Sequence, residues 1–167
     1  KEYRRQRQMC IRDRLELVVA GAHLHGQPLN HQLTDLGARF VESTTTSPDY
    51  RMFALATEPA KPGLVRVPGD GAAMAVEAWA LSPAALGTFL AALPAPMALG
   101  RVELADGREA TGFLVEPYAV AGAEDITAYG GWAAYRARGT DAGRGSGVDA
   151  GRSGATDPGG GTVAPRG

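Results

Sequence analysis

The chain has 167 residues, of which 44% are hydrophobic and 21% are charged, and its formal net charge is −1 with neutral histidines. No apolar run approaches the roughly twenty residues of a transmembrane helix, so we predict no membrane partner. Cys10 is the only cysteine, which excludes an internal disulfide and agrees with a cytoplasmic location.

The two ends of the chain differ from its middle. Residues 1–14 carry six Lys or Arg against two acids, which is typical of a basic arm for nucleic acid. However, the run RQRQMCIRDR resembles a translated sequencing-adapter peptide, and we interpret residues 1–14 as a non-native basic head. Residues 139–167 contain ten glycines and only two aliphatic side chains larger than alanine. We predict that this Gly-rich tail is disordered.

The remaining residues, 15–138, are predicted to form one domain. They carry eight Lys or Arg against thirteen Asp or Glu, a net charge of about −5. An acidic domain argues against a nucleic-acid partner.

The first half of this domain is predicted to be mainly β-structure. Alternating or continuous apolar residues predict strands at 15–20, 39–46, 50–56, 64–67 and 73–81. The turn residues Ser47-Pro48-Asp49 predict that the second and third of these strands form a hairpin. Leucines at helical spacing predict a short helical turn over 30–36.

The second half is predicted to contain a hairpin and further helices, so that the whole domain has six or seven strands and two or three helices. Ser82 and Pro83 suit the start of a helix that runs to about Leu93. Asp106-Gly107 predicts a tight turn between strands at 101–104 and 108–116. Short helices are predicted at 123–127 and 131–138. These elements predict an α+β fold with a mostly antiparallel sheet.

All three histidines lie in one stretch, GAHLHGQPLNHQL, which spans residues 21–33 and follows the first strand. Imidazoles and amides among glycines favour a ligand-facing loop. The structural alternative is that each histidine is a hydrogen-bonded core or rim residue. A zinc site is disfavoured because structural zinc prefers four Cys or His ligands, and the only cysteine, Cys10, lies in the head that we interpret as non-native. We therefore predict no metal.

Glu77 is predicted to share a strand face with the apolar Trp79 and Leu81. A carboxylate there is either paired with a cation or has a raised pKa, because burial disfavours its charge. Arg51 and Lys61 are the candidate partners.

Several blocks of the chain resemble, in the same order, the C-terminal domain of allophanate hydrolase: GAHLHGQPLNHQL, TSPDYR, KPGLVRV, VEAWALS, LPAPMALGRVELADGREATGFLVEP and EDITAYGGWAAY. The resemblance covers about residues 15–135. It implies a β-barrel-like α+β fold similar to γ-glutamyl cyclotransferase. Residues 91–96 lack the carboxylate on which cyclotransferases rely, which argues against that activity.

The resemblance also implies a function. Enzymes of this family degrade urea through allophanate, which an N-terminal amidase-signature domain deaminates to N-carboxycarbamate. The C-terminal domain is associated with decarboxylating that dianion to carbamate. This chain has no counterpart of the amidase domain, so we expect no allophanate hydrolysis by the fragment alone. We further expect a homodimer and no cofactor.

The same chemistry assigns roles to residues of this sequence. His23 is the predicted general acid, because an imidazole can hold and give a proton near neutral pH. Arg51 and Lys61 are predicted to bind the two carboxylates, and Gln27 and Asn30 to orient the substrate. Glu77 is predicted to set the histidine tautomer or to pair with Arg51. His25 and His31 are interpreted as bystanders.

Two other functions remain open at this point. The domain could be an assembly and stability module of the amidase, which predicts an exposed apolar patch. It could instead bind a small carboxylate without turning it over. That function predicts the same pocket as the enzyme.

Overall fold

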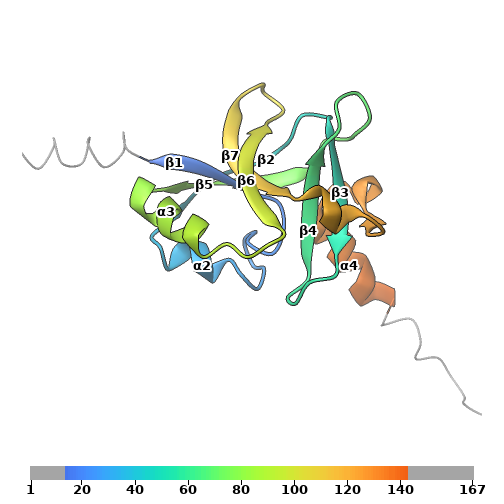
Figure 1. Cartoon of the computed structure of the whole chain (residues 1–167), viewed down its shortest axis with the longest axis horizontal. Coiled ribbons are helices and arrows are strands. Elements are labelled where there is room, and N and C mark those ends of the chain that lie inside the picture. The colour runs from blue at the N-terminus through green and yellow to red at the C-terminus, as the bar shows by residue number, and fades with distance from the viewer. Residues whose placement is uncertain (1–13, 143–167) are drawn as a thin grey trace, which may run out of the picture.

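The structure is a computed structural model that describes residues 14–142, with side chains as far as Arg138. Residues 1–13 of the predicted head and 143–167 of the predicted tail lie outside this part. The elements, shown in Figure 1, are β1 (Leu15–Val19), α2 (His31–Thr34), β2 (Arg39–Thr45), β3 (Tyr50–Leu55), β4 (Lys61–Arg66), β5 (Ala75–Leu81), α3 (Pro83–Ala91), β6 (Met97–Glu103), β7 (Glu109–Val115), η1 (Pro117–Val120), β8 (Glu124–Asp125), η2 (Thr127–Tyr129) and α4 (Trp132–Ala142).

The strands form two sheets. A five-stranded sheet has the order β2-β5-β1-β7-β6, and a three-stranded sheet has the order β4-β3-β8. Every pair of strands is antiparallel except β1 and β7, which run parallel at the centre of the larger sheet. The mostly antiparallel α+β fold is therefore confirmed. Within residues 14–142 the strands do not close into a barrel, because β2 and β6 are both edges of the larger sheet.

The predicted hairpin between 39–46 and 50–56 is wrong. β2 pairs with β5, while β3 pairs with β4 and β8. The segment between β2 and β3 instead carries the chain from one sheet to the other. Its backbone is satisfied on the way, since the Thr46 N–H donates to the Met74 carbonyl and the Ser47 N–H to the Glu103 carbonyl, both at 2.9 Å.

The predicted helix and turn of the second half are confirmed. The Ser82 hydroxyl accepts a hydrogen bond from the Ala85 N–H at 3.2 Å and so caps α3. Gly107 adopts φ +83 in the turn between β6 and β7. The short helix predicted at 123–127 is instead β8 followed by η2, and α4 continues four residues beyond its predicted end.

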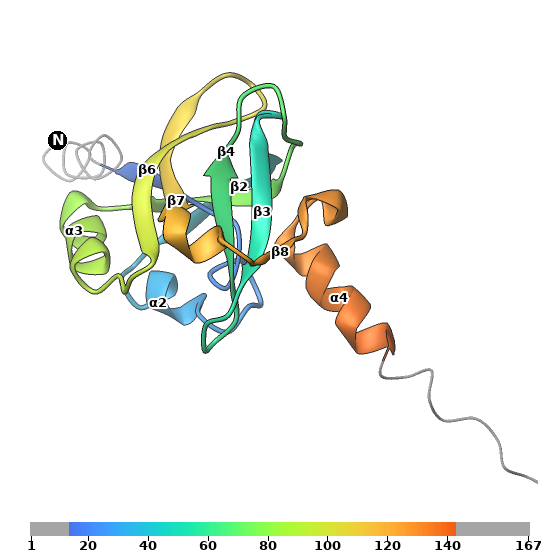
Figure 2. The same cartoon turned by 45° about the vertical axis from the view of Figure 1, so that its right-hand side comes forward.

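The two sheets and their helices are arranged side by side (Figure 2). α2 and α3 lie at the end of the larger sheet, and α4 lies beside β3 and β8. The core contains β1 itself, whose Leu17, Val18 and Val19 are almost completely buried, together with Met52 and Trp79. None of the described helices is long and apolar enough to cross a bilayer.

A close backbone approach joins the loop after β1 to β4. A Cβ atom added at Gly21 would lie 2.2 Å from Cδ of Pro62, a separation at which atoms overlap. Pro62 is a buried residue of β4 and follows Lys61 directly. Glycine at position 21 therefore lets the histidine loop and β4 lie against each other.

We predict that Gly21→Ala destabilises the domain by about 1–3 kcal/mol, because an overpacked site must shift its neighbours. Gly87→Ala is the matched control, since Gly87 lies within α3 and a Cβ there meets nothing within 4 Å. That control should stabilise the domain by about 0.5–1 kcal/mol. Urea unfolding measures the change in the free energy of unfolding for each variant. Equal changes in the two variants would show that the close contact between Gly21 and Pro62 does not need glycine.

Candidate functional site

A pocket of about 410 Å³ lies where the histidine loop, α2, the end of α3 and the starts of β4 and β6 meet. Most of its lining is apolar. The side chains with polar groups that line it are those of His23, Gln32, Lys61 and Thr88. The Thr88 hydroxyl already donates to the Ala84 carbonyl of its own helix at 3.1 Å. The Thr88 hydroxyl can therefore only accept from a ligand, and His23, Gln32 and Lys61 are the other polar side chains that a ligand would meet.

A series of tight turns positions His23. The Leu24 N–H donates to the Gly21 carbonyl at 3.0 Å, and the Leu29 N–H returns to the Ala22 carbonyl at 2.9 Å. The side-chain amide of Asn30 donates to the backbone carbonyl of His23 at 2.8 Å. The loop is thus fixed on both sides of the imidazole by its own backbone and by one amide.

The imidazole of His23 is held between aromatic rings. It stacks on Phe113 of β7 with centroids 5.0 Å apart, and Phe89 of α3 meets it edge-on at 5.3 Å. Nε2 of His23 lies 2.9 Å from Oε1 of Gln32. A carbonyl oxygen only accepts, so this contact requires the hydrogen on Nε2 and leaves Nδ1 as the basic atom of the neutral ring.

Burial is the main reason that the pKa of His23 lies below its usual value of 6.5. The hydrogen bond to Gln32 opposes this shift, whereas the positive charge of Lys61 adds to it. The imidazole of His23 is therefore neutral at neutral pH when no anion is bound. Among the described residues Lys61 has no carboxylate partner, so the pocket has one unpaired positive charge.

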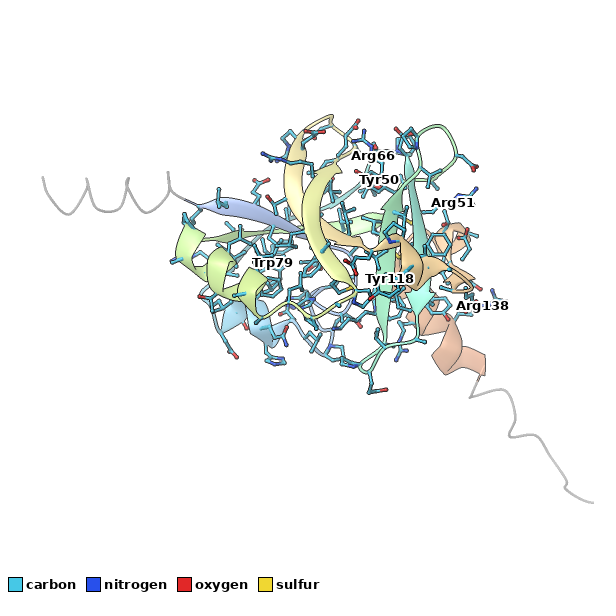
Figure 3. The ribbon with its side chains drawn as sticks, viewed as in Figure 1. Tyr50, Arg51, Arg66, Trp79, Tyr118 and Arg138 are labelled. Carbon is cyan, nitrogen blue, oxygen red and sulfur yellow. The ribbon has the colours of Figure 1, made fainter. Side chains whose placement is uncertain are left out.

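Arg51 is not brought to this pocket. It lies beside a second pocket of about 310 Å³ with Asp70 and Asp125. Its guanidinium pairs with Asp70 at 2.7 Å and with Asp125 at 3.4 Å, and these two carboxylates already satisfy its charge. In Figure 3, Arg51 lies on the side of β3, whereas Trp79 of β5 lies near α3.

Glu77 also lies outside the His23 pocket, and it pairs with neither of its predicted cations. Its Oε2 accepts from the His25 N–H at 2.8 Å and from the indole N–H of Trp79 at 3.1 Å. It therefore holds the backbone of the histidine loop and does not contact an imidazole. Gln27 does not line the pocket either, and Asn30 acts on the backbone of His23.

Gln32 is a polar residue of the pocket that was not predicted from the sequence as a site residue. A signal for it was present, since Leu29, Gln32 and Leu36 recur at helical spacing and all three line the pocket. His31, one residue earlier, points elsewhere, with Nδ1 2.9 Å from the Pro28 carbonyl. Among residues 14–142, no group of three or more His, Cys, Asp or Glu side chains could hold a metal ion.

The coupling between His23 and Lys61 gives a direct test. We predict that Lys61→Gln raises the pKa of His23 because it removes a nearby positive charge, while burial still keeps that pKa below 6.5. Arg51→Gln removes a cation from the other pocket and should leave the titration unchanged. NMR of the imidazole protons measures the titration of His23 in both variants. An unchanged midpoint in Lys61→Gln would show that Lys61 does not influence His23.

Comparison with known proteins identifies the family. The family model described as "Allophanate hydrolase C-terminal domain" matches residues 15–137. Urea amidolyase of Saccharomyces cerevisiae is 38% identical over 126 residues, which are 72% of this chain and 7% of that protein. The chain thus spans a small part of the curated relatives that it matches.

Solved structures agree with this result. Kluyveromyces lactis allophanate hydrolase superposes with a TM-score of 0.73 at 36% identity, over 75% of this chain and 21% of that one. A uropathogenic E. coli-specific protein superposes with a TM-score of 0.70 at 33% identity, over 74% of this chain and 96% of that one. By its sequence and by its fold, this chain belongs to the allophanate hydrolase C-terminal domain family.

Proposed function

We propose that the domain decarboxylates N-carboxycarbamate to carbamate, after an amidase-signature domain of the full-length protein has deaminated allophanate. The observation that carries this proposal is that His23 and Lys61 line one apolar pocket. Family membership supports the pathway, since relatives are named urea amidolyase and allophanate hydrolase. The amidase step is assigned to the part of those longer proteins that this chain does not cover.

Lys61 binds the substrate in this proposal. N-carboxycarbamate carries two carboxylates, and a half-buried ammonium without a carboxylate partner in the described residues attracts one of them. The carboxylate held by Lys61 is the one that stays on the product. The other carboxylate then lies among apolar side chains, where loss of its charge as neutral CO₂ is favoured.

The bond changes balance with one proton. The C–N bond to the departing carboxylate breaks, CO₂ leaves, and the electron pair of that bond remains on nitrogen. His23 delivers a proton to the nitrogen, so the dianion becomes CO₂ and the carbamate monoanion. General acids placed in this way typically accelerate a reaction about 10²- to 10⁴-fold.

Without substrate, the lowered pKa of His23 leaves the imidazole neutral, so substrate binding must raise that pKa before His23 can act as an acid. A nearby negative charge favours the protonated imidazole, so the dianion itself raises the pKa of His23 and loads the ring with a proton. Since Nε2 donates to Gln32, the incoming proton enters on Nδ1 and leaves from it. Gln32 is a positioning residue that keeps the other nitrogen occupied.

The reaction is tested with an amidase domain supplied in trans and ¹³C-labelled allophanate. With the natural sequence, N-carboxycarbamate should not accumulate, and the second equivalent of ammonia should follow the first without a lag. With His23→Ala the intermediate should accumulate in ¹³C NMR spectra, because only its spontaneous loss of CO₂ remains.

Arg51→Gln is the control for this experiment, since it removes a cation outside the pocket and should behave as the natural sequence does. The intermediate should be compared with the natural sequence, with His23→Ala and with no added domain. Equal levels in all three would contradict catalysis by this domain.

The pH dependence of the decarboxylation has a defined sign. A general acid works in its protonated form, so kcat/KM should fall as pH rises through the pKa of His23 in the free domain, which lies below 6.5. The bound dianion raises that pKa, so kcat should fall at a higher pH than kcat/KM does. Rates corrected for spontaneous decarboxylation measure both limbs. A rate that rises with pH would point to a base in place of an acid.

A binding module without turnover is the second candidate. It is favoured by the neutral state of His23 at neutral pH, which leaves Lys61 as the charged recognition group of the pocket. In the assay above, this function predicts that the domain binds the intermediate and slows its loss.

The third candidate, an assembly module, is favoured by the large hydrophobic side chains that are exposed: Leu15, Phe40, Val41, Leu90 and Tyr118. The homodimer remains a prediction.

A further inference from the structure

The pocket beside His23 is larger than N-carboxycarbamate needs. That molecule has two carbon, one nitrogen and four oxygen atoms. If each occupied as much space as a water molecule in the liquid, they would fill at most about 200 Å³. The pocket measures about 410 Å³, so about half of it stays unfilled.

The pocket is bounded mainly by hydrocarbon. Leu93, Pro94 and Met97 line it from the connection between α3 and β6, and Leu36 lines it from the end of the α2 region. None of these side chains offers a hydrogen bond. Water in such a space is poorly satisfied, whereas an apolar group that displaces it gains about 0.8 kcal/mol per methylene.

The charge of the pocket favours a single carboxylate. Lys61 contributes one positive charge, and His23 contributes none at neutral pH because burial lowers its pKa. A monocarboxylate balances this charge, whereas a dianion leaves one charge to be neutralised by protonation of His23.

From the volume, the lining and the charge together, we propose that this pocket also binds monocarboxylic acids with an unbranched apolar tail of about four to six carbons. The carboxylate pairs with Lys61, and the tail lies along Leu93 and Met97. Such acids occupy the cation that the dianion uses, so they compete with it. This binding does not depend on the decarboxylation.

The test titrates the whole chain with acetate, butanoate and hexanoate at constant pH and ionic strength, using calorimetry or NMR. Each added methylene should tighten binding by up to about fourfold, so hexanoate, with four more methylenes, should bind up to about 250-fold more tightly than acetate. Lys61→Gln should weaken butanoate and hexanoate by a similar factor, and Lys61→Arg should retain binding. Equal affinity for acetate and hexanoate, or no binding of any of the three acids, overturns the proposal.

Two leucines three positions apart supply a matched pair of variants. Leu93 lines the pocket, whereas Leu90 is 52% exposed on α3 and does not. Leu93→Gln should reduce hexanoate affinity about tenfold and leave acetate unchanged, and Leu90→Gln should change neither. Met97→Gln serves the same purpose if Leu93→Gln does not fold. Equal effects at positions 90 and 93 overturn the proposal.

The outcomes separate this inference from the proposed reaction. Hexanoate binding without any effect on the ¹³C intermediate supports the inference and removes the reaction. Decarboxylation that requires His23, together with no preference for longer acids, supports the reaction and removes the inference.

Discussion

The contact between Gly21 and Pro62 is the constraint on which the site depends. A side chain at position 21 would overlap the proline ring, and its absence lets the loop after β1 lie directly on β4. His23 follows two residues after the glycine, and Lys61 comes immediately before the proline. The two basic groups therefore line one pocket because a Cβ atom is missing between their segments.

Besides burial, the proximity of these two groups lowers the pKa of the imidazole of His23. An ammonium and an imidazolium repel each other, and apolar surroundings strengthen that repulsion. Burial and the nearby ammonium group lower the pKa of His23, so its imidazole is neutral at neutral pH when no anion is bound. An arriving anion relieves the repulsion. The aromatic rings of Phe89 and Phe113 hold the imidazole in place.

Local chemistry made part of the fold predictable. The Ser82-Pro83 start of α3 and the Asp106-Gly107 turn were predicted from a few adjacent residues, and their geometry depends on those residues alone. The partner of β2 was not predictable in this way. Its alternating pattern requires a neighbouring strand but does not specify which one, and β5 lies about thirty residues further along the chain.

The site was predictable in part, for the same reason. The histidine loop indicated His23, and the resemblance indicated Lys61, and both line the pocket. Arg51 lies in a matching block, but Asp70 and Asp125 take its charge, and no feature of the sequence near Arg51 shows that Asp125 is close. Pairings of that kind depend on distant segments, so a cation cannot be assigned to a ligand from its block alone.

The parallel pairing of β1 with β7 has a consequence for biosynthesis. β1 leaves the ribosome first among the described strands, yet one of its edges waits for a strand made about ninety residues later. The antiparallel partner β5 follows β1 by about sixty residues and covers the other edge, whereas the edge that β7 will cover stays unpaired for longer and can pair with another chain meanwhile. Because Phe113 belongs to that late strand, the imidazole receives its stacking partner only when translation of the domain is nearly complete.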